Sequence, residues 1–149
     1  MSTLDELGQI EVKGVGPPDA KVALIGEAPG GEEELSGRPF VGRAGRLLDQ
    51  CLMEAGINRS ECYIDNAIRV RPPENKVKFF FSNRSDFKRP SPTALHYRDL
   101  LKENLSRVRP NIAVALGATA LWALSSDGSN ITSKRGTLFE STLVPGLKC

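Results

Sequence analysis

Val22-Ala23-Leu24-Ile25-Gly26-Glu27-Ala28-Pro29-Gly30-Gly31 is the stretch of sequence that decides the fold. Its first four residues form a short, continuous apolar run, and a glycine-rich turn follows directly. A run of this kind, ending at such a turn, is typical of a parallel strand that is buried on both faces. We therefore predict a strand over 22–25 that delivers Gly26 and its successors to one edge of a sheet.

Two helices are predicted from spacing and end signals. After the turn, apolar residues recur on one helix face until Gly56 stops the pattern. The expected buried face is Ala44, Leu47, Leu48, Cys51, Leu52 and Ala55. Ser91 as N-cap and Pro92 in the first turn begin a second helix. Its expected apolar face is Ala94, Tyr97, Leu101, Leu105 and Val108.

The remaining patterns alternate between strand and helix. Strands are predicted at 63–65 and 112–116, a short helix at 118–124, and the last strand material at 138–139 and 142–144. This alternation predicts an α/β fold with three α-β-α layers and a mostly parallel central sheet of about four strands. The chain stops at 145–149, where another strand is expected to begin. We therefore expect residues 1–149 to form a single domain that lacks its C-terminal strand and helix.

Composition narrows the class of protein. A chain of 149 residues with 40% hydrophobic and 26% charged residues is ordinary for one globular domain. Neither a membrane-spanning run nor a signal pattern in Met1–Ile10 is visible, which predicts a cytoplasmic protein without a membrane partner. The three cysteines include no Cys-x-x-Cys pair, so idle thiols are expected rather than a disulfide framework or a cysteine-rich metal site.

The positive charges are clustered. The net charge is only +2, but basic residues gather between Arg38 and Arg46 and between Arg69 and Arg89. Clusters on loops suit a phosphate backbone, and a solvated basic surface explains them equally well.

Three segments are expected to meet at the carboxyl ends of the strands, where ligands bind in open α/β sheets. They are 26–31, 66–73 and 117–119, so Glu27 and Asn66 should point into one crevice. The glycine-rich turn lacks the Gly-Lys-Ser/Thr ending of a phosphate loop and the spacing of a dinucleotide fingerprint. Pro29 also removes one amide donor, so binding of a nucleoside triphosphate or NAD is disfavoured.

A longer motif resembles a known family. Gly26-Glu27-Ala28-Pro29-Gly30-Gly31-Glu32-Glu33-Glu34, followed by Gly37-Arg38-Pro39-Phe40-Val41-Gly42-Arg43-Ala44-Gly45, closely resembles motif 1 of the uracil-DNA glycosylase superfamily, in its family 4 branch. Further matches are Tyr63-Ile64-Asp65-Asn66, Arg71-Pro72-Pro73-Glu74-Asn75, the segment 110–117 and Arg135-Gly136. The long 76–90 insertion is more similar to domains at the front of some phage DNA polymerases.

The resemblance implies a DNA-repair hydrolase that flips uracil out of DNA and cleaves its N-glycosidic bond. It assigns Phe40 to stacking on the base and Asn66 to reading the base edge. The chemistry agrees, because an aromatic face can stack on any base and a carboxamide can pair with uracil N3–H and O4. A core role for Phe40 and a strand-end cap for Asn66 remain open.

The resemblance also places Glu27 and Ala28, with Glu33, where the attacking water is handled. A solvated helix start is the alternative for these acidic residues. No metal is implied for the chemistry. Arg38, Arg43, Lys134 and Arg135 are candidate phosphate contacts.

Two departures from the family pattern alter these expectations. Family 4 enzymes hold an iron–sulfur cluster with four cysteines, but here the N-terminal pair is absent, Val70 stands near the third position and His96 near the fourth. We predict no cluster, with the insertion filling some of that space and His96 at the helix surface or in packing. The family's His-Pro-Ser loop would follow the Arg135-Gly136 segment, beyond Cys149, so we expect this chain alone to bind uracil weakly and catalyse poorly.

Two alternatives stay open. One is a non-catalytic DNA-binding module that senses uracil, such as the N-terminal domain of a phage-type DNA polymerase. The other is a protein that binds small nucleotides. The expected partners are uracil-containing DNA and, in the first alternative, an appended polymerase domain. The chain itself is expected to be a monomer.

Overall fold

A computed structural model of the chain describes residues 10–81, 87–126 and 131–149. Its strands are β1 (Val22–Gly26), β2 (Tyr63–Asn66) and β3 (Ile112–Ala115). Its α-helices are α1 (Gly31–Ser36), α2 (Arg43–Ala55), α3 (Pro92–Val108), α4 (Ala118–Ser125) and α5 (Ile131–Lys134). Short 3-10 helices lie at η1 (Arg59–Glu61), η2 (Pro73–Asn75) and η3 (Val77–Phe81).

The sheet is parallel and its order is β2-β1-β3. β1 is the central strand: Gly26 lies beside Asn66 of β2, and Ile25 beside Ala115 of β3. The α/β class and the placement of these strands are confirmed. Since all three strands run the same way, their carboxyl ends meet at one edge of the sheet.

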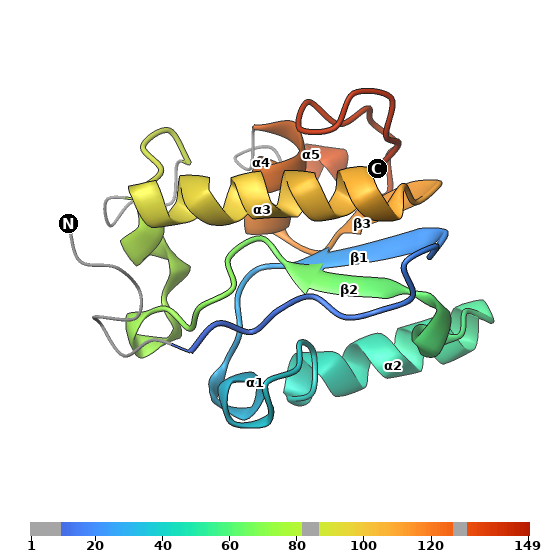
Figure 1. Cartoon of the computed structure of the whole chain (residues 1–149), viewed down its shortest axis with the longest axis horizontal. Helices are drawn as coiled ribbons and strands as arrows, with labels where there is room; N and C mark the ends of the chain where they lie inside the picture. Colours follow the sequence, from blue (N-terminus) through green and yellow to red (C-terminus); the bar gives the residue numbers. More distant parts are fainter. Residues whose placement is uncertain (1–9, 82–86, 127–130) are drawn as a thin grey trace.

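Helices cover both faces of the sheet, which confirms the three predicted layers. α1 and α2 lie on one side, and α3 and α4 lie on the other (Figure 1). The larger core joins the sheet to α3 and α4, and a smaller one packs Leu48 and Leu52 of α2 against Leu24 and Ile64. None of the helices in the described parts of the chain is long and apolar enough to cross a membrane.

The helix ends agree with the sequence signals, but the buried face of α2 is narrower than predicted. Gly56 caps α2 with φ 72°, and the Ser91 side chain accepts a hydrogen bond from Ala94 N–H at the start of α3. The buried residues of α2 are Gly45, Leu48 and Leu52, whereas Leu47 is 62% exposed. Only the part of the apolar face of α2 that packs against the sheet, through Leu48 and Leu52, is buried. Leu47 lies outside that contact.

The expectation of about four strands is wrong for the described residues, which form three. The segments 138–139 and 142–144 join no strand, and isolated bridges form instead between Glu140 and Lys148 and between Lys148 and Ile112 of β3. Ser141 accounts for this, because its hydroxyl donates to the carbonyl of Leu124 and accepts from the N–H groups of Leu143 and Val144. The chain turns back and pairs Phe139 with Cys149 through two backbone bonds of 3.0 and 2.8 Å.

A buried ionic cluster fixes the end of β2. Both oxygens of Asp65 are used: Oδ1 accepts from Asn66 N–H (2.7 Å) and Arg69 Nε (3.2 Å), and Oδ2 accepts from Tyr63 Oη (2.8 Å) and Arg69 Nη2 (2.7 Å). Arg69 also reaches Glu11 at 3.5 Å and so ties the N-terminal segment to this strand. A carboxylate buried this completely requires such a full set of donors.

Candidate functional site

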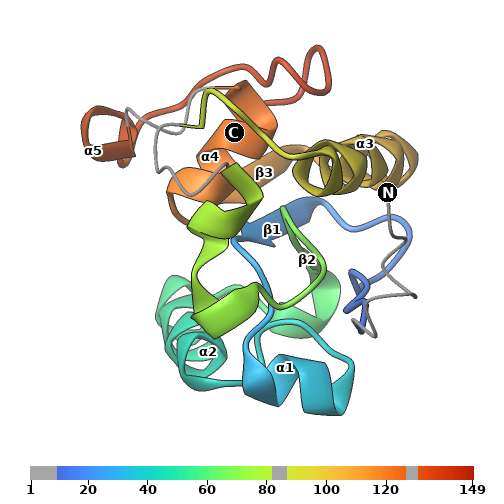
Figure 2. The same ribbon diagram turned by 90° about the vertical axis from the view of Figure 1, so that its left-hand side faces the viewer.

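A pocket of about 200 Å³ opens at the carboxyl edge of the sheet. Its lining is Glu27, Ala28, Glu33, Phe40, Arg43, Ala44, Asn66 and Leu116. Figure 2 looks onto this edge, where β1 continues to α1 and β3 to α4. The convergence predicted for Glu27 and Asn66 is therefore observed. Phe40, from the connection between α1 and α2, joins them in the lining.

Gly26 forms the floor between the two candidate base-binding residues. A Cβ atom built on Gly26 would lie 2.2 Å from Cζ of Phe40 and 2.6 Å from Oδ1 of Asn66. Atoms this close overlap, so any side chain here would displace the ring or the carboxamide. The glycine at the strand end is what allows Phe40 and Asn66 to approach one another.

Asn66 is a nearly buried residue whose side chain lines the pocket. The residue is 3% exposed and its backbone is held by the β1–β2 pairing and by Asp65. Among residues 10–81, 87–126 and 131–149, no hydrogen bond involves its side-chain amide. Because the described residues leave no buried side-chain nitrogen or oxygen without a partner, the amide atoms of Asn66 are open to the pocket, where they can bind a ligand that supplies one donor and one acceptor.

Phe40 lies partly buried between the pocket and the smaller core. Its backbone is in the left-handed region at φ 55°. The core alternative for Phe40 is thus partly correct: one portion of the ring packs on the core, and another lines the pocket.

Glu33 braces the loop around the pocket. Its Oε1 accepts from Gly30 N–H at 3.0 Å, and its Oε2 accepts from the N–H groups of Val41 (2.9 Å) and Gly42 (2.6 Å). Partial burial works to raise its pKa, but the N–H groups of Gly42, Val41 and Gly30 outweigh it and hold the pKa below the ordinary value. This geometry favours a structural role for Glu33 over the expected water-handling role. Glu33 also lies in the first turn of α1, which agrees with the alternative that these acidic residues belong to a helix start.

Glu27 is the carboxylate that remains available. It is exposed at the pocket rim, and its Oε2 accepts from Thr119 Oγ1 of α4 at 3.4 Å. Desolvation by its surroundings raises the pKa of Glu27, and the bond from Thr119 offsets part of the rise. Ala28 follows it in the lining and offers only backbone groups there.

The predicted basic contacts flank this edge from both sides. Arg43 lines the pocket itself, and the exposed Arg38 precedes it on the α1–α2 connection. Lys134 and Arg135 line an adjoining hollow that shares Leu116 with the pocket. Lys134 also lies over the Phe139 ring at 5.5 Å. α5 lies on the α4 side of the sheet, opposite α1 and α2 (Figure 2).

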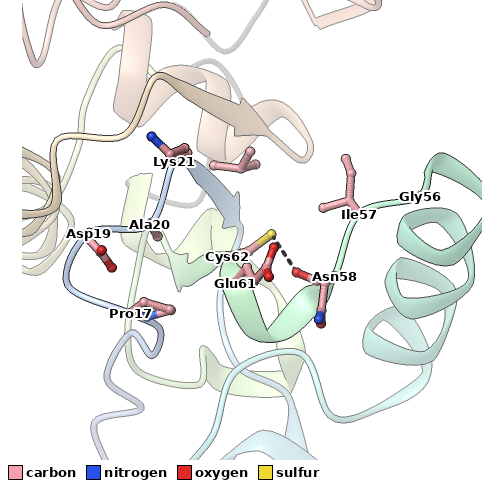
Figure 3. A pocket seen from close by; sticks show the side chains of 10 residues that line it. Pro17, Asp19, Ala20, Lys21, Gly56, Ile57, Asn58, Glu61 and Cys62 are labelled. Carbon is pink, nitrogen blue, oxygen red and sulfur yellow. Dashed lines mark hydrogen bonds between the residues drawn. The ribbon is translucent and has the colours of Figure 1, made fainter.

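A larger cavity, of about 490 Å³, lies at the opposite edge of the sheet, between the residues before β1 and those before β2 (Figure 3). Cys62 lines it, and its thiol donates to the carbonyl of Asn58 at 3.6 Å. Its lining does not include Glu27, Phe40 or Asn66, the residues expected to bind a ligand. We therefore take the smaller pocket as the functional site.

Comparison with known proteins decides the family. The profile of the Uracil DNA glycosylase superfamily matches residues 13–145. The chain belongs to this superfamily. It is 41% identical over 127 residues to the type-4 uracil-DNA glycosylase of Thermotoga maritima, covering 84% of this chain and 60% of that protein. It is 39% identical over 110 residues to the type-4 uracil-DNA glycosylase of Archaeoglobus fulgidus, covering 73% of this chain and 49% of that protein.

A third relative comes from a different kind of protein. The chain is 27% identical over 142 residues to a DNA polymerase of Bacillus phage SP01, covering 94% of this chain and 14% of that polymerase. The chain therefore spans 60% and 49% of the length of these two type-4 glycosylases and 14% of the polymerase.

The iron–sulfur cluster that the superfamily's type-4 branch implies does not fit the residues present. Val70 is fully buried in the larger core together with Phe80 and Phe81 of the insertion. His96 is exposed, with its ring 5.0 Å from that of Tyr97. The described residues contain no group of three His, Cys, Asp or Glu side chains that could hold a metal ion.

Two contributors to this site were missed by sequence reasoning. Leu116 closes the pocket from the end of β3, and Arg59 contacts the loop of Phe40 from η1. The apolar run at 112–116 could have indicated Leu116. No sequence signal indicates Arg59. It lies in η1, which precedes β2, so the topology alone would place it at the amino edge of the sheet and away from the site.

Proposed function

We propose that this chain recognises uracil flipped out of DNA and takes part in hydrolysis of its N-glycosidic bond. The observation that carries the proposal is the convergence of the Phe40 ring and the Asn66 carboxamide over Gly26, where both line the pocket. The pocket, at about 200 Å³, is smaller than the roughly 300–1,000 Å³ of ordinary ligand sites, which suits a single base.

The carboxamide explains the choice of base. Asn66 Oδ1 accepts from uracil N3–H while its Nδ2 donates to uracil O4. Cytosine presents the opposite arrangement, with an acceptor at N3 and a donor at N4. In the same pose, Asn66 Oδ1 would face the N3 acceptor and Nδ2 would face the N4 donor, so neither hydrogen bond forms. Phe40 adds stacking, which any base supplies, so it contributes affinity rather than selectivity.

The chemistry assigned to the rim is hydrolysis. The bond from sugar C1′ to uracil N1 breaks, the electron pair leaves with the uracil, and water bonds to C1′ and loses a proton. Glu27, as a carboxylate, stabilises the cationic sugar and orients the water, with the Ala28 backbone beside it. Glu33 supports this arrangement by holding the loop.

DNA is the proposed partner. Arg38, Arg43, Lys134 and Arg135 flank the pocket on both sides of the sheet edge, where the phosphates adjoining a flipped nucleotide would lie. We further propose that the protein is a cytoplasmic monomer that works without an iron–sulfur cluster, since the residues at the cluster positions are Val70 and His96.

A single-uracil oligonucleotide tests the function. The chain is expected to bind it more tightly than matched oligonucleotides with cytosine or thymine at the same position, and to form alkali-labile abasic sites there. Because the chain spans only part of its relatives, binding is the primary measurement and release the secondary one. Equal binding to all three oligonucleotides, with no release from any, would contradict the proposal.

The pH dependence of uracil release tests the role of Glu27. Its pKa is raised, so the carboxylate takes up a proton at a pH where an ordinary glutamate, near 4.5, would still be ionised. Release should therefore fall as the pH drops through this raised pKa, and Glu27→Gln should abolish most activity at every pH.

Thr119→Val provides the companion variant. It removes the hydrogen bond that lowers the pKa of Glu27, so the acidic limb of the pH–rate profile should move to higher pH. An acidic limb that stays in place in Thr119→Val would show that another group titrates.

A non-catalytic role is the second candidate, favoured by the similarity to the phage polymerase over 94% of this chain. In that case the same pocket would retain uracil-containing template without cleaving it. Tight, uracil-dependent binding with no abasic product over a long incubation would support this candidate over hydrolysis.

A further inference from the structure

Arg59 contacts the base pocket from behind, through the backbone of the Phe40 loop. Its Nη2 donates to the carbonyl of Phe40 at 2.8 Å and to that of Pro39 at 3.0 Å. Its Nη1 donates to Asp49 Oδ1 of α2 at 2.6 Å. Arg59 does not line the pocket, so its influence on a ligand passes through the loop.

The loop needs such support because Phe40 adopts an unfavourable conformation. Its φ of 55° lies in the left-handed region, which a bulky residue occupies only when its surroundings impose it. A Cβ on Gly45 would lie 2.0 Å from the Phe40 carbonyl oxygen, so this carbonyl is pressed against α2. Arg59 donates a hydrogen bond to the same carbonyl.

The ion pair with Asp49 fixes the guanidinium to α2. The Arg59 side chain is 29% exposed, and its rigid fork of donors suits two neighbouring carbonyls and a carboxylate together. A lysine at this position could keep the charge pair but has no planar fork. The arrangement therefore depends on arginine geometry rather than on charge alone.

We propose that Arg59 is the positioning residue that sets the ring of Phe40 in the plane needed to stack on the base. The inference rests on the proposed uracil pocket and adds a residue outside it. The loop conformation places the ring over Gly26, and Arg59 holds that conformation. Loss of Arg59 should then remove stacking while the hydrogen bonds of Asn66 remain.

The test compares two bases that share a hydrogen-bonding edge but differ in aromaticity. Oligonucleotides carry either uracil or 5,6-dihydrouracil, whose saturated ring stacks poorly, and dissociation constants are measured for both. The wild-type chain should prefer uracil by about tenfold, the size of one base-stacking contact. Phe40→Leu and Arg59→Gln should each reduce this preference to near unity, and Arg59→Lys should give an intermediate value.

Arg46→Gln is the matched control. Arg46 also lies on this side of the molecule, but among the described residues its side chain pairs with Glu32 alone, at 3.5 Å and in solvent, so the preference for uracil should stay. In the Phe40→Leu background, Arg59→Gln should change the preference no further. Thermal unfolding of each variant separates a loss of fold from a loss of stacking; should Arg59→Gln not fold, Asp49→Asn removes its ion pair alone and should lower the preference partway.

The outcomes separate the inference from the function beneath it. A wild-type chain without any preference for uracil over dihydrouracil would count against the base pocket itself. A wild-type preference that persists in Arg59→Gln, or equal weakening of both oligonucleotides, would count against the role of Arg59 alone.

Discussion

Replacing Asn66 by aspartate is expected to move the preference of the pocket from uracil toward cytosine. An ionised aspartate accepts from uracil N3–H but cannot donate to O4, so binding of uracil should weaken by about 1–3 kcal/mol. The same carboxylate can accept from cytosine N4–H, where the amide nitrogen of Asn66 would instead meet another donor. A protonated aspartic acid can carry its proton on either oxygen and so pairs with either base. Because burial favours protonation, the shift toward cytosine should diminish as the pH falls.

The measurement is the ratio of dissociation constants for oligonucleotides that differ only in carrying uracil or cytosine. Asn104→Asp is the matched control, since Asn104 lies on α3, is absent from the pocket lining, and accepts a hydrogen bond from Arg107. An unchanged ratio in Asn66→Asp would remove Asn66 from base recognition.

The largest effect on stability is expected at Arg69. Arg69→Leu leaves the Asp65 carboxylate buried at 0% exposure without its principal partner, which should lower the free energy of unfolding by about 3–5 kcal/mol. Arg71→Leu, two residues further on, removes an arginine that is 38% exposed and lies 4.0 Å from Glu34, so the loss should stay within about 1 kcal/mol.

Urea unfolding of both variants checks this prediction. The double variant Asp65→Asn with Arg69→Leu removes the uncompensated charge and should recover part of the lost stability. Equal losses of unfolding free energy for Arg69→Leu and Arg71→Leu would show that the buried Asp65–Arg69 pair stabilises the fold no more than an exposed pair does. Since Asp65 also holds the N–H of Asn66, base recognition should decline together with stability.

The sequence predicts well those parts of the fold that depend on interactions between residues close together in the chain. The apolar run before Gly26, the stop at Gly56 and the Ser91 cap all act within a few residues, and all three are confirmed. The exposure of Leu47 and the missing fourth strand depend on what lies across the molecule. A helix face or a strand pattern does not contain that information.

The same division holds for the site. Glu27 and Asn66 follow their strands directly, so parallel topology alone brings them together. Phe40 entered through the family resemblance, and the structure places it in the same pocket. The roles of Glu33 and Arg59 depend on backbone groups of the Phe40 loop, whose conformation no residue pattern specifies.

The central position of β1 has a consequence for how the molecule folds. Ala23 of β1 pairs with Tyr63 of β2, which is 40 residues later in the chain, whereas Val22 pairs with Ile112 of β3, which is 90 residues later. Closing so long a loop is entropically slow, so docking of β3 should come late in folding. Leu116, which closes the pocket, arrives with that strand. A nascent or partly folded chain would therefore lack a complete pocket, and recognition of a base would begin only with the last cooperative step.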